Sequence, residues 1–83
     1  MSFESRFQIG KNGVTEGVIK SLNQDLKMHN RIRISVLKSA GREKDKIIKI
    51  AENIVSGVDY YCVYKLIGFT IILMRRSSYI KQK

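Results

Sequence analysis

The sequence predicts a two-layer α+β protein with the element order βαβαββ. Apolar residues recur at helical spacing in two segments, and strand-like runs of alternating, aromatic or β-branched residues occur in four others. Because crossovers between parallel strands are right-handed, both helices are expected on one face of a four-stranded mixed sheet. The opposite face of that sheet is then free or only partly covered.

The first helix is expected to follow a glycine turn. Residues 7–9 alternate apolar and polar side chains, as a short strand does, and lead into Gly10-Lys11-Asn12-Gly13. Thr15 is placed to cap the helix N-terminus, its hydroxyl accepting a hydrogen bond from a backbone N–H. His29 lies at the other end, where the helix dipole favours a cation. The face predicted to be buried is formed by Val18, Ile19, Leu22 and Leu26.

A second strand and a second helix are expected next. Residues 31–37 alternate strictly, with Arg31 and Arg33 on the side opposite the isoleucines, which predicts a half-buried strand. Residues 42–46 are charged and open a helix that Gly57 is expected to end in a left-handed cap conformation. The apolar face of this helix is predicted to be formed by Ile47, Ala51, Ile54 and Val55.

Two strands joined by a tight turn are expected to close the fold. Residues 61–66 and 69–75 are rich in aromatic and β-branched side chains, and Gly68 between them supplies a hairpin turn. A single domain is expected over residues 1–83, with its core at about residues 7–76. Residues 77–83 are predicted to form a flexible basic tail.

The charge of the chain points to a polyanionic partner. Sixteen Lys and Arg stand against seven Asp and Glu, giving a formal net charge of +9, while 43% of residues are hydrophobic, enough for a folded core. The amino terminus lacks the apolar stretch of a signal peptide, and residues 66–74 are too short an apolar run to span a membrane as a helix. We therefore expect a cytoplasmic protein with no membrane partner.

Few residues of the chain could carry out catalysis. There is one histidine, His29, and one cysteine, Cys62, so no disulfide or cysteine-based zinc site is expected. The carboxylates are scattered, and neither common nucleotide-binding glycine pattern is present. The sequence therefore predicts a protein that is not an enzyme, with no catalytic residue, metal, cofactor or small-molecule substrate.

The turn Gly10-Lys11-Asn12-Gly13 is the strongest candidate binding site in the sequence. Two glycines allow a partner to approach the backbone closely, and the helix that follows offers unpaired N–H groups to a phosphate. A GXXG loop clamps the nucleic-acid backbone in the KH class of RNA-binding domains. The alternative is that these glycines only satisfy positive φ angles in an ordinary turn. With the charge of the chain, RNA contact is favoured, with Lys11 as a phosphate partner.

Further cations could extend such a site over the sheet. Arg31 and Arg33 are expected to point outward, and Arg75 and Arg76 end the last strand. Outward cations on strands also serve simply to prevent aggregation, so both interpretations stay open. Tyr60, Tyr61 and Tyr64 could stack on bases, but packing is the commoner use of aromatic residues in strands.

Three stretches of the chain share their pattern with one known family. Residues 9–19 read IGKNGVTEGVI, where the family has the signature Ile-Gly-Lys-x-Gly-Leu-Thr. His29 followed by residues 31–36 is similar to the family's second strand, and Ile67-Gly68 with residues 71–76 is similar to its closing hairpin. Over residues 7–76 the chain therefore resembles the CRM domain, which is named for chloroplast RNA splicing and ribosome maturation.

The resemblance implies both a fold and a function. It implies a fold similar to the carboxy-terminal domain of bacterial translation initiation factor three, with Gly10 to Gly13 as the RNA-contacting loop. The chain looks most like the stand-alone prokaryotic members, which associate with precursors of the large ribosomal subunit. The residues expected to bind RNA are Gly10, Lys11, Asn12, Gly13, Thr15, Arg31, Arg33, Arg75 and Arg76.

Two alternatives remain at this point. The Alba chromatin proteins share the topology, an Ile-Gly-Lys turn and a Gly-Arg pair like Gly41-Arg42, although their last strands form a long arm. The other alternative is a non-catalytic protein-interaction module whose charge is incidental.

Overall fold

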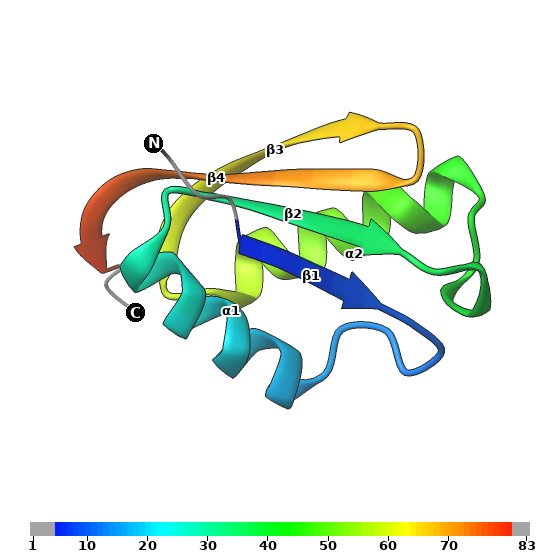
Figure 1. Cartoon of the computed structure of the whole chain (residues 1–83), viewed down its shortest axis with the longest axis horizontal. Helices are drawn as coiled ribbons and strands as arrows, with labels where there is room; N and C mark the ends of the chain where they lie inside the picture. Colours follow the sequence, from blue (N-terminus) through cyan, green and yellow to red (C-terminus); the bar gives the residue numbers. More distant parts are fainter. Residues whose placement is uncertain (1–4, 81–83) are drawn as a thin grey trace.

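The computed structural model describes residues 5–80, with side chains described as far as residue 76. The element order is βαβαββ, as predicted, and Figure 1 shows the arrangement in space. The elements are β1 (Ser5–Ile9), α1 (Glu16–Met28), β2 (Arg31–Val36), the short 3-10 helix η1 (Lys38–Ala40), α2 (Lys44–Gly57), β3 (Tyr60–Ile67) and β4 (Thr70–Ile80).

The four strands form one mixed sheet in the order β1-β2-β4-β3. β1 and β2 are parallel because α1 carries the chain back across the sheet between them, whereas β4 runs antiparallel to both of its neighbours. The hairpin between β3 and β4 is tight, since Ile67 pairs directly with Thr70 across Gly68 and Phe69. Together these connections place β2 and β4 at the centre of the sheet.

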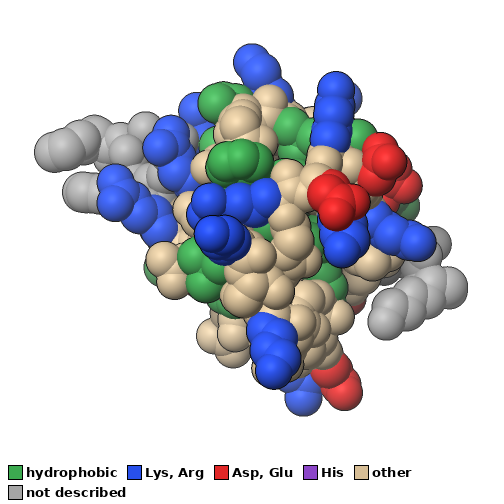
Figure 2. Space-filling view, turned by 90° about the vertical axis from the view of Figure 1, so that its right-hand side faces the viewer, with side chains coloured by type: hydrophobic (Ala, Val, Ile, Leu, Met, Phe, Trp, Pro, Cys, Tyr) green, Lys and Arg blue, Asp and Glu red, His purple; other side chains and the backbone are tan. Residues whose placement is uncertain are grey.

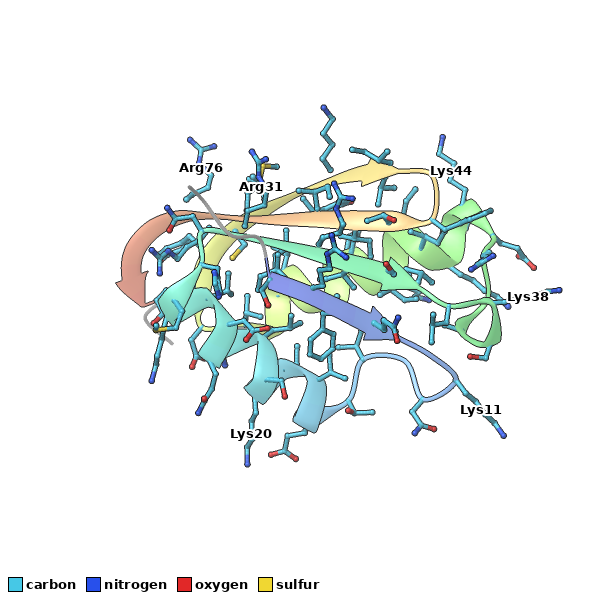
Figure 3. The ribbon with its side chains drawn as sticks, viewed as in Figure 1. Lys11, Lys20, Arg31, Lys38, Lys44 and Arg76 are labelled. Atoms are coloured by element: carbon cyan, nitrogen blue, oxygen red, sulfur yellow. The ribbon has the colours of Figure 1, made fainter. Side chains whose placement is uncertain are left out.

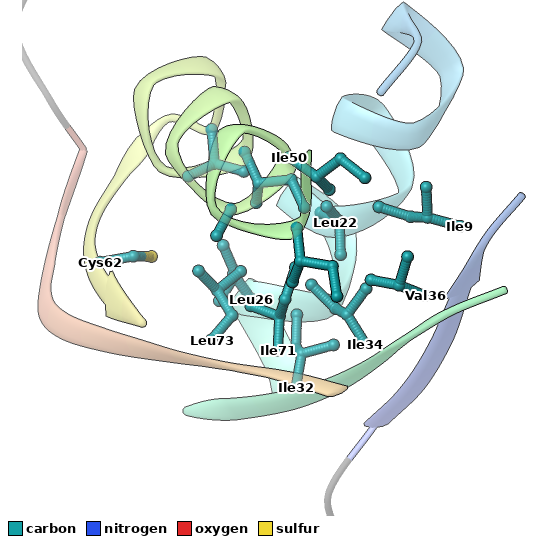
Figure 4. Close-up of a cluster of buried hydrophobic side chains, with 14 of the residues drawn as sticks. Ile9, Leu22, Leu26, Ile32, Ile34, Val36, Ile50, Cys62, Ile71 and Leu73 are labelled. Atoms are coloured by element: carbon teal, nitrogen blue, oxygen red, sulfur yellow. The ribbon is translucent and has the colours of Figure 1, made fainter. Parts of the chain in front are cut away.

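The core lies between the sheet and the two helices, which cover the same face (Figure 4). The alternation predicted for β2 is confirmed: Ile32 and Ile34 are fully buried, while Arg31 and Arg33 are exposed. Ile50 joins the predicted apolar face of α2, and Val55 is only partly buried. The largest fully buried side chains are Ile9, Leu22, Leu26, Ile32, Ile34, Ile54, Ile71, Leu73, Val36 and Val58.

The last strand is longer than the sequence pattern predicted. β4 continues to Ile80, which pairs with Tyr60, so residues 77–80 belong to a strand and not to a loose tail. Backbone pairing does not require apolar side chains, so polar composition is a poor guide to where a strand ends. An irregularity between Tyr60 and Cys62 accommodates the extra residues of β4. The rest of the predicted tail, residues 81–83, lies outside the described residues.

Gly57 serves a purpose other than the left-handed cap that was predicted. It is the last residue of α2, followed by an extended Val58, and the described glycines with positive φ are Gly13, Gly41 and Gly68. A Cβ at Gly57 would lie 2.8 Å from Cδ1 of Ile19 on α1. The glycine therefore leaves room for the side chain of Ile19, which would have to shift if position 57 carried a Cβ.

Candidate nucleic-acid interface

The turn between β1 and α1 closes on itself. The backbone N–H of Gly13 donates to the carbonyl oxygen of Gly10 over 2.9 Å, and Gly13 has a φ of 65°. A side chain at Gly13 would be strained by that φ, whereas a Cβ at Gly10 would make ordinary contacts with Ser39 and Leu37 at 3.4 and 3.5 Å. The fold therefore requires glycine at position 13 but not at position 10.

Thr15 connects this turn to α1. Its Oγ1 accepts a hydrogen bond from the backbone N–H of Val18 over 3.2 Å, which confirms the predicted N-cap. The hydroxyl also lies beside the turn, where a shallow depression of about 310 Å³ begins. The depression is lined by Gln8, Ile9, Gly10, Lys11, Asn12, Gly13, Thr15 and Val18.

Three connections of the chain meet at one end of the sheet. The turn follows β1, the segment 37–43 follows β2, and the β3–β4 hairpin folds back at the same end (Figure 1). Backbone hydrogen bonds join them: Leu37 donates to the carbonyl oxygen of Ile9 over 2.8 Å, and Val36 donates to that of Phe69 over 2.9 Å. We call this surface, formed by residues 10–13, 37–43 and 68–69 with the first two turns of α2, the loop end.

Cations from separate segments gather at the loop end. Lys11 from the turn, Lys38 from η1 and Lys44 from α2 project there, whereas Lys20 projects from α1 away from it (Figure 3). Figure 2 views the molecule from this side, with Lys and Arg side chains around it and a few acidic ones between them. Residues far apart in the sequence thus form one electropositive surface, of the kind that attracts polyanions.

A groove separates the turn from α2. It has a volume of about 250 Å³ and lies between Gly13 on one side and Lys46 and Lys49 on the other. Both lysines are exposed, and they share a helix face because they are three residues apart. Sequence reasoning missed them because their position opposite the turn depends on the tertiary fold. The groove is lined by Gly13, Val14, Ala40, Lys46, Lys49, Ile50 and Asn53.

Arg42 contacts two of the segments that meet at the loop end. Its Nε donates to the carbonyl oxygen of Val36 over 3.3 Å, and its guanidinium lies 4.6 Å from the centre of the Phe69 ring. Phe69 is 50% exposed, so this cation–π contact stands at the surface of the hairpin. Arg42 therefore connects the segment after β2 to the tip of the β3–β4 hairpin.

The predicted arginines fall in two other places. Arg31, Arg33 and Arg76 are exposed on the sheet face that the helices do not cover, and Arg31 and Arg76 lie away from the loop end (Figure 3). Arg75 lies on the helix-covered side instead, where it donates to the carbonyl oxygen of Leu26. The structure therefore brings the turn residues to the loop end, with Thr15 beside them, and places Arg31, Arg75 and Arg76 elsewhere.

The described part of the chain lacks two further features. Between residues 5 and 80 no three His, Cys, Asp or Glu side chains come together as metal ligands would. None of the helices described here combines the length and the apolar character needed to cross a bilayer.

Comparison with known proteins gives a family, a relative and a solved structure. Residues 1–75 match the family model of the CRS1 / YhbY (CRM) domain. The chain is 36% identical over 76 residues to Bacillus subtilis (strain 168) YqeI, which is named a probable RNA-binding protein; the match covers 92% of this chain and 75% of YqeI.

The solved structure is that of SAV1595 from Staphylococcus aureus, determined in solution and described as a candidate RNA-binding protein. It superposes with a TM-score of 0.69 at 29% sequence identity, covering 90% of this chain and 74% of SAV1595. The fold described above is therefore shared with this protein.

Proposed function

The chain belongs to the CRS1 / YhbY (CRM) domain family, and on that premise we propose that it is a non-enzymatic protein that binds RNA at the loop end. The names of its relatives from Bacillus subtilis and Staphylococcus aureus support RNA as the partner. The observation that carries the proposal is the meeting of the Gly10–Gly13 turn with lysines from two other segments, η1 and α2, at one end of the sheet.

Backbone recognition is the mechanism that suits this surface. The fold has room for a side chain at position 10, but Gly10 has none. An RNA strand can therefore approach the backbone of the turn closely. Lys46 and Lys49 then neutralise phosphates along the groove, and Lys11 neutralises a phosphate at the depression that the turn lines. Thr15 contributes by holding the start of α1 beside the turn.

The proposed RNA is structured ribosomal RNA of large-subunit precursors. Phosphate contacts set the position of a protein on RNA but carry little sequence information, so specificity comes from RNA shape and from unpaired bases. The resemblance to stand-alone prokaryotic CRM proteins favours the large subunit. Such a role places the protein in the cytoplasm.

The two alternatives differ in what supports them. The match to the CRM family model favours that family over the Alba proteins. The tight turn at Gly68 and Phe69 agrees, because Alba proteins have a long arm at this place. An interaction module for other proteins would not need lysines both at the turn and along the groove, so RNA binding accounts for more of the surface.

Crosslinking in cells followed by RNA sequencing tests the proposed partner. The full chain is expected to crosslink mainly to large-subunit ribosomal RNA, including unprocessed precursor sequences. Crosslinks spread over unrelated messenger RNAs, or over genomic DNA, would overturn this assignment.

A pair of double variants tests the proposed surface. Lys46→Ala with Lys49→Ala removes two cations from the groove, and Lys20→Ala with Lys27→Ala removes two exposed cations from α1. For a structured RNA, the first pair is expected to lower the slope of log affinity against log salt by about two, because two phosphate contacts are lost. The second pair is the control, and equal effects of both pairs would show that only the overall charge matters.

A further inference from the structure

The sheet face without helices has an unusual mixture of side chains. Solvated faces of antiparallel sheets are commonly polar, but here large apolar residues stand at outward positions. Tyr61 is 50% exposed, Val63 39% and Ile67 56%. The outward residues are Arg6 and Gln8 on β1, Arg31, Arg33 and Ser35 on β2, Thr70, Ile72, Met74 and Arg76 on β4, and Tyr61, Val63, Lys65 and Ile67 on β3.

Ile72 lies at the centre of this face and is nevertheless buried. It is 6% exposed, yet it does not belong to the main core cluster. In the sheet register it stands between Arg33 on β2 and Lys65 on β3. Long cationic side chains can lay their aliphatic stems over such a residue while keeping their charged ends in water. The face therefore has a small apolar centre rimmed by cations.

The strand register places cations and apolar side chains in the same rows across the sheet. Arg31, Met74 and Val63 form one row across β2, β4 and β3. The next row holds Arg33 and Ile72, with Arg6 beside Arg33 on β1. Because neighbouring strands lie about 4.8 Å apart, cations on β1 and β2 border an apolar surface on β4 and β3.

The charge of this face selects among possible partners. Five of its described outward residues are cations and none is acidic, so a second copy of the chain would be repelled. A polyanion that also presents flat apolar surfaces fits better. Single-stranded RNA is such a partner, because unpaired bases stack on aromatic and apolar side chains while phosphates meet cations. Duplex RNA keeps its base faces stacked internally.

We propose that the helix-free face is a second RNA-binding surface, which receives unpaired nucleotides. Tyr61 stacks on a base, Val63 and Met74 extend the apolar surface, and Arg31 and Arg76 neutralise phosphates. The row of Thr70 and Ile67 borders the hairpin, so the face is continuous with the loop end. This inference rests on the proposed function and adds single-strand recognition to it.

Two RNA probes separate this face from the loop end. One is a blunt RNA hairpin, and the other is the same hairpin with a single-stranded tail of uridines. The tail is expected to strengthen binding by the full chain. Tyr61→Ala is expected to weaken binding of the tailed hairpin about tenfold and to leave the blunt hairpin unchanged, while Tyr61→Phe retains binding. Tyr61 is exposed, so the fold is expected to tolerate both changes.

The outcomes distinguish the two proposals. If the protein binds the blunt hairpin but the tail adds nothing, the second surface is overturned and the loop end stands. If neither hairpin binds, the proposed function fails as well.

NMR titration with a uridine oligonucleotide gives an independent measurement. The methyl signals of Val63 and Ile67 are expected to shift, and shifts restricted to residues 10–13 would overturn the inference. A concentration-dependent dimer that buries the Val63 methyls would also overturn it.

Discussion

Arg75 on β4 binds the carbonyl oxygen of Leu26 at the end of α1. Carbonyl oxygens in the last turn of a helix have no partner within the helix, and a cation there interacts favourably with the dipole. The same guanidinium donates to Oδ1 of Asn30 over 2.6 Å and lies 5.5 Å from the centre of the Tyr60 ring. Arg75 therefore joins α1 to the sheet, whereas Arg76 is exposed on the opposite face.

Replacing each of these neighbouring arginines is expected to change the free energy of unfolding by very different amounts. Arg75→Ala removes hydrogen bonds to a helix end and is expected to lower the free energy of unfolding by about 1–3 kcal/mol. Arg76→Ala is expected to change it by less than about 0.5 kcal/mol. Urea denaturation of the two variants measures the difference. Equal destabilisation by both changes would contradict the structural role of Arg75.

A side chain at Gly57 is expected to disturb the contact between the helices. In Gly57→Ala the new Cβ would lie 2.8 Å from Cδ1 of Ile19 and 3.3 Å from its Cγ1. Such overpacking is expected to lower the free energy of unfolding by about 1–2 kcal/mol, which thermal or urea unfolding detects.

The double variant with Ile19→Val identifies the cause. Valine lacks the Cδ1 atom, so Gly57→Ala is expected to cost less in that background, or to stabilise, since alanine favours a helix by about 0.5–1 kcal/mol over glycine. The same cost in both backgrounds would show that Ile19 is not the obstacle.

The two glycines of the turn are expected to respond differently to alanine. Gly13→Ala forces a side chain into a φ of 65° and is expected to cost about 1–2 kcal/mol of unfolding free energy. Gly10→Ala meets only ordinary contacts and is expected to cost less than about 0.5 kcal/mol. If Gly10→Ala nevertheless weakens RNA binding, Gly10 is needed for contact with RNA and not for the fold. A large loss of stability in Gly10→Ala would contradict this interpretation.

Much of the fold could be predicted because burial follows simple periods along the chain. Ile32 and Ile34 are buried between exposed Arg31 and Arg33, as strict alternation requires. Thr15 caps α1 because its hydroxyl lies within reach of a nearby backbone N–H, a local relationship that the sequence displays. Local rules therefore sufficed for the order of the main elements and for the position of the turn.

Other features depend on residues far away in the sequence. The close approach at Gly57 involves Ile19, and the extension of β4 depends on pairing with Tyr60, so neither has a local signal. The groove lysines face the turn only after α2 packs against the sheet. Arg75 and Arg76 look alike in sequence, but strand alternation places them on opposite faces. The candidate site could therefore be predicted at the turn and not beyond it.

Salt-dependent affinity shows whether the Gly10–Gly13 turn contacts RNA phosphates. Lys11→Ala with Asn12→Asp lowers the net charge by two units at the turn, and Lys20→Ala with Gln24→Glu does so on the exposed surface of α1. The affinity of each variant for a structured RNA is measured over a range of salt concentrations.

The turn variant is expected to bind more weakly than the control, with a slope of log affinity against log salt reduced by about one because the Lys11 contact is lost. The control is expected to keep the slope of the unmodified protein. An unchanged affinity and slope for the turn variant would show that the Gly10–Gly13 turn does not contact RNA.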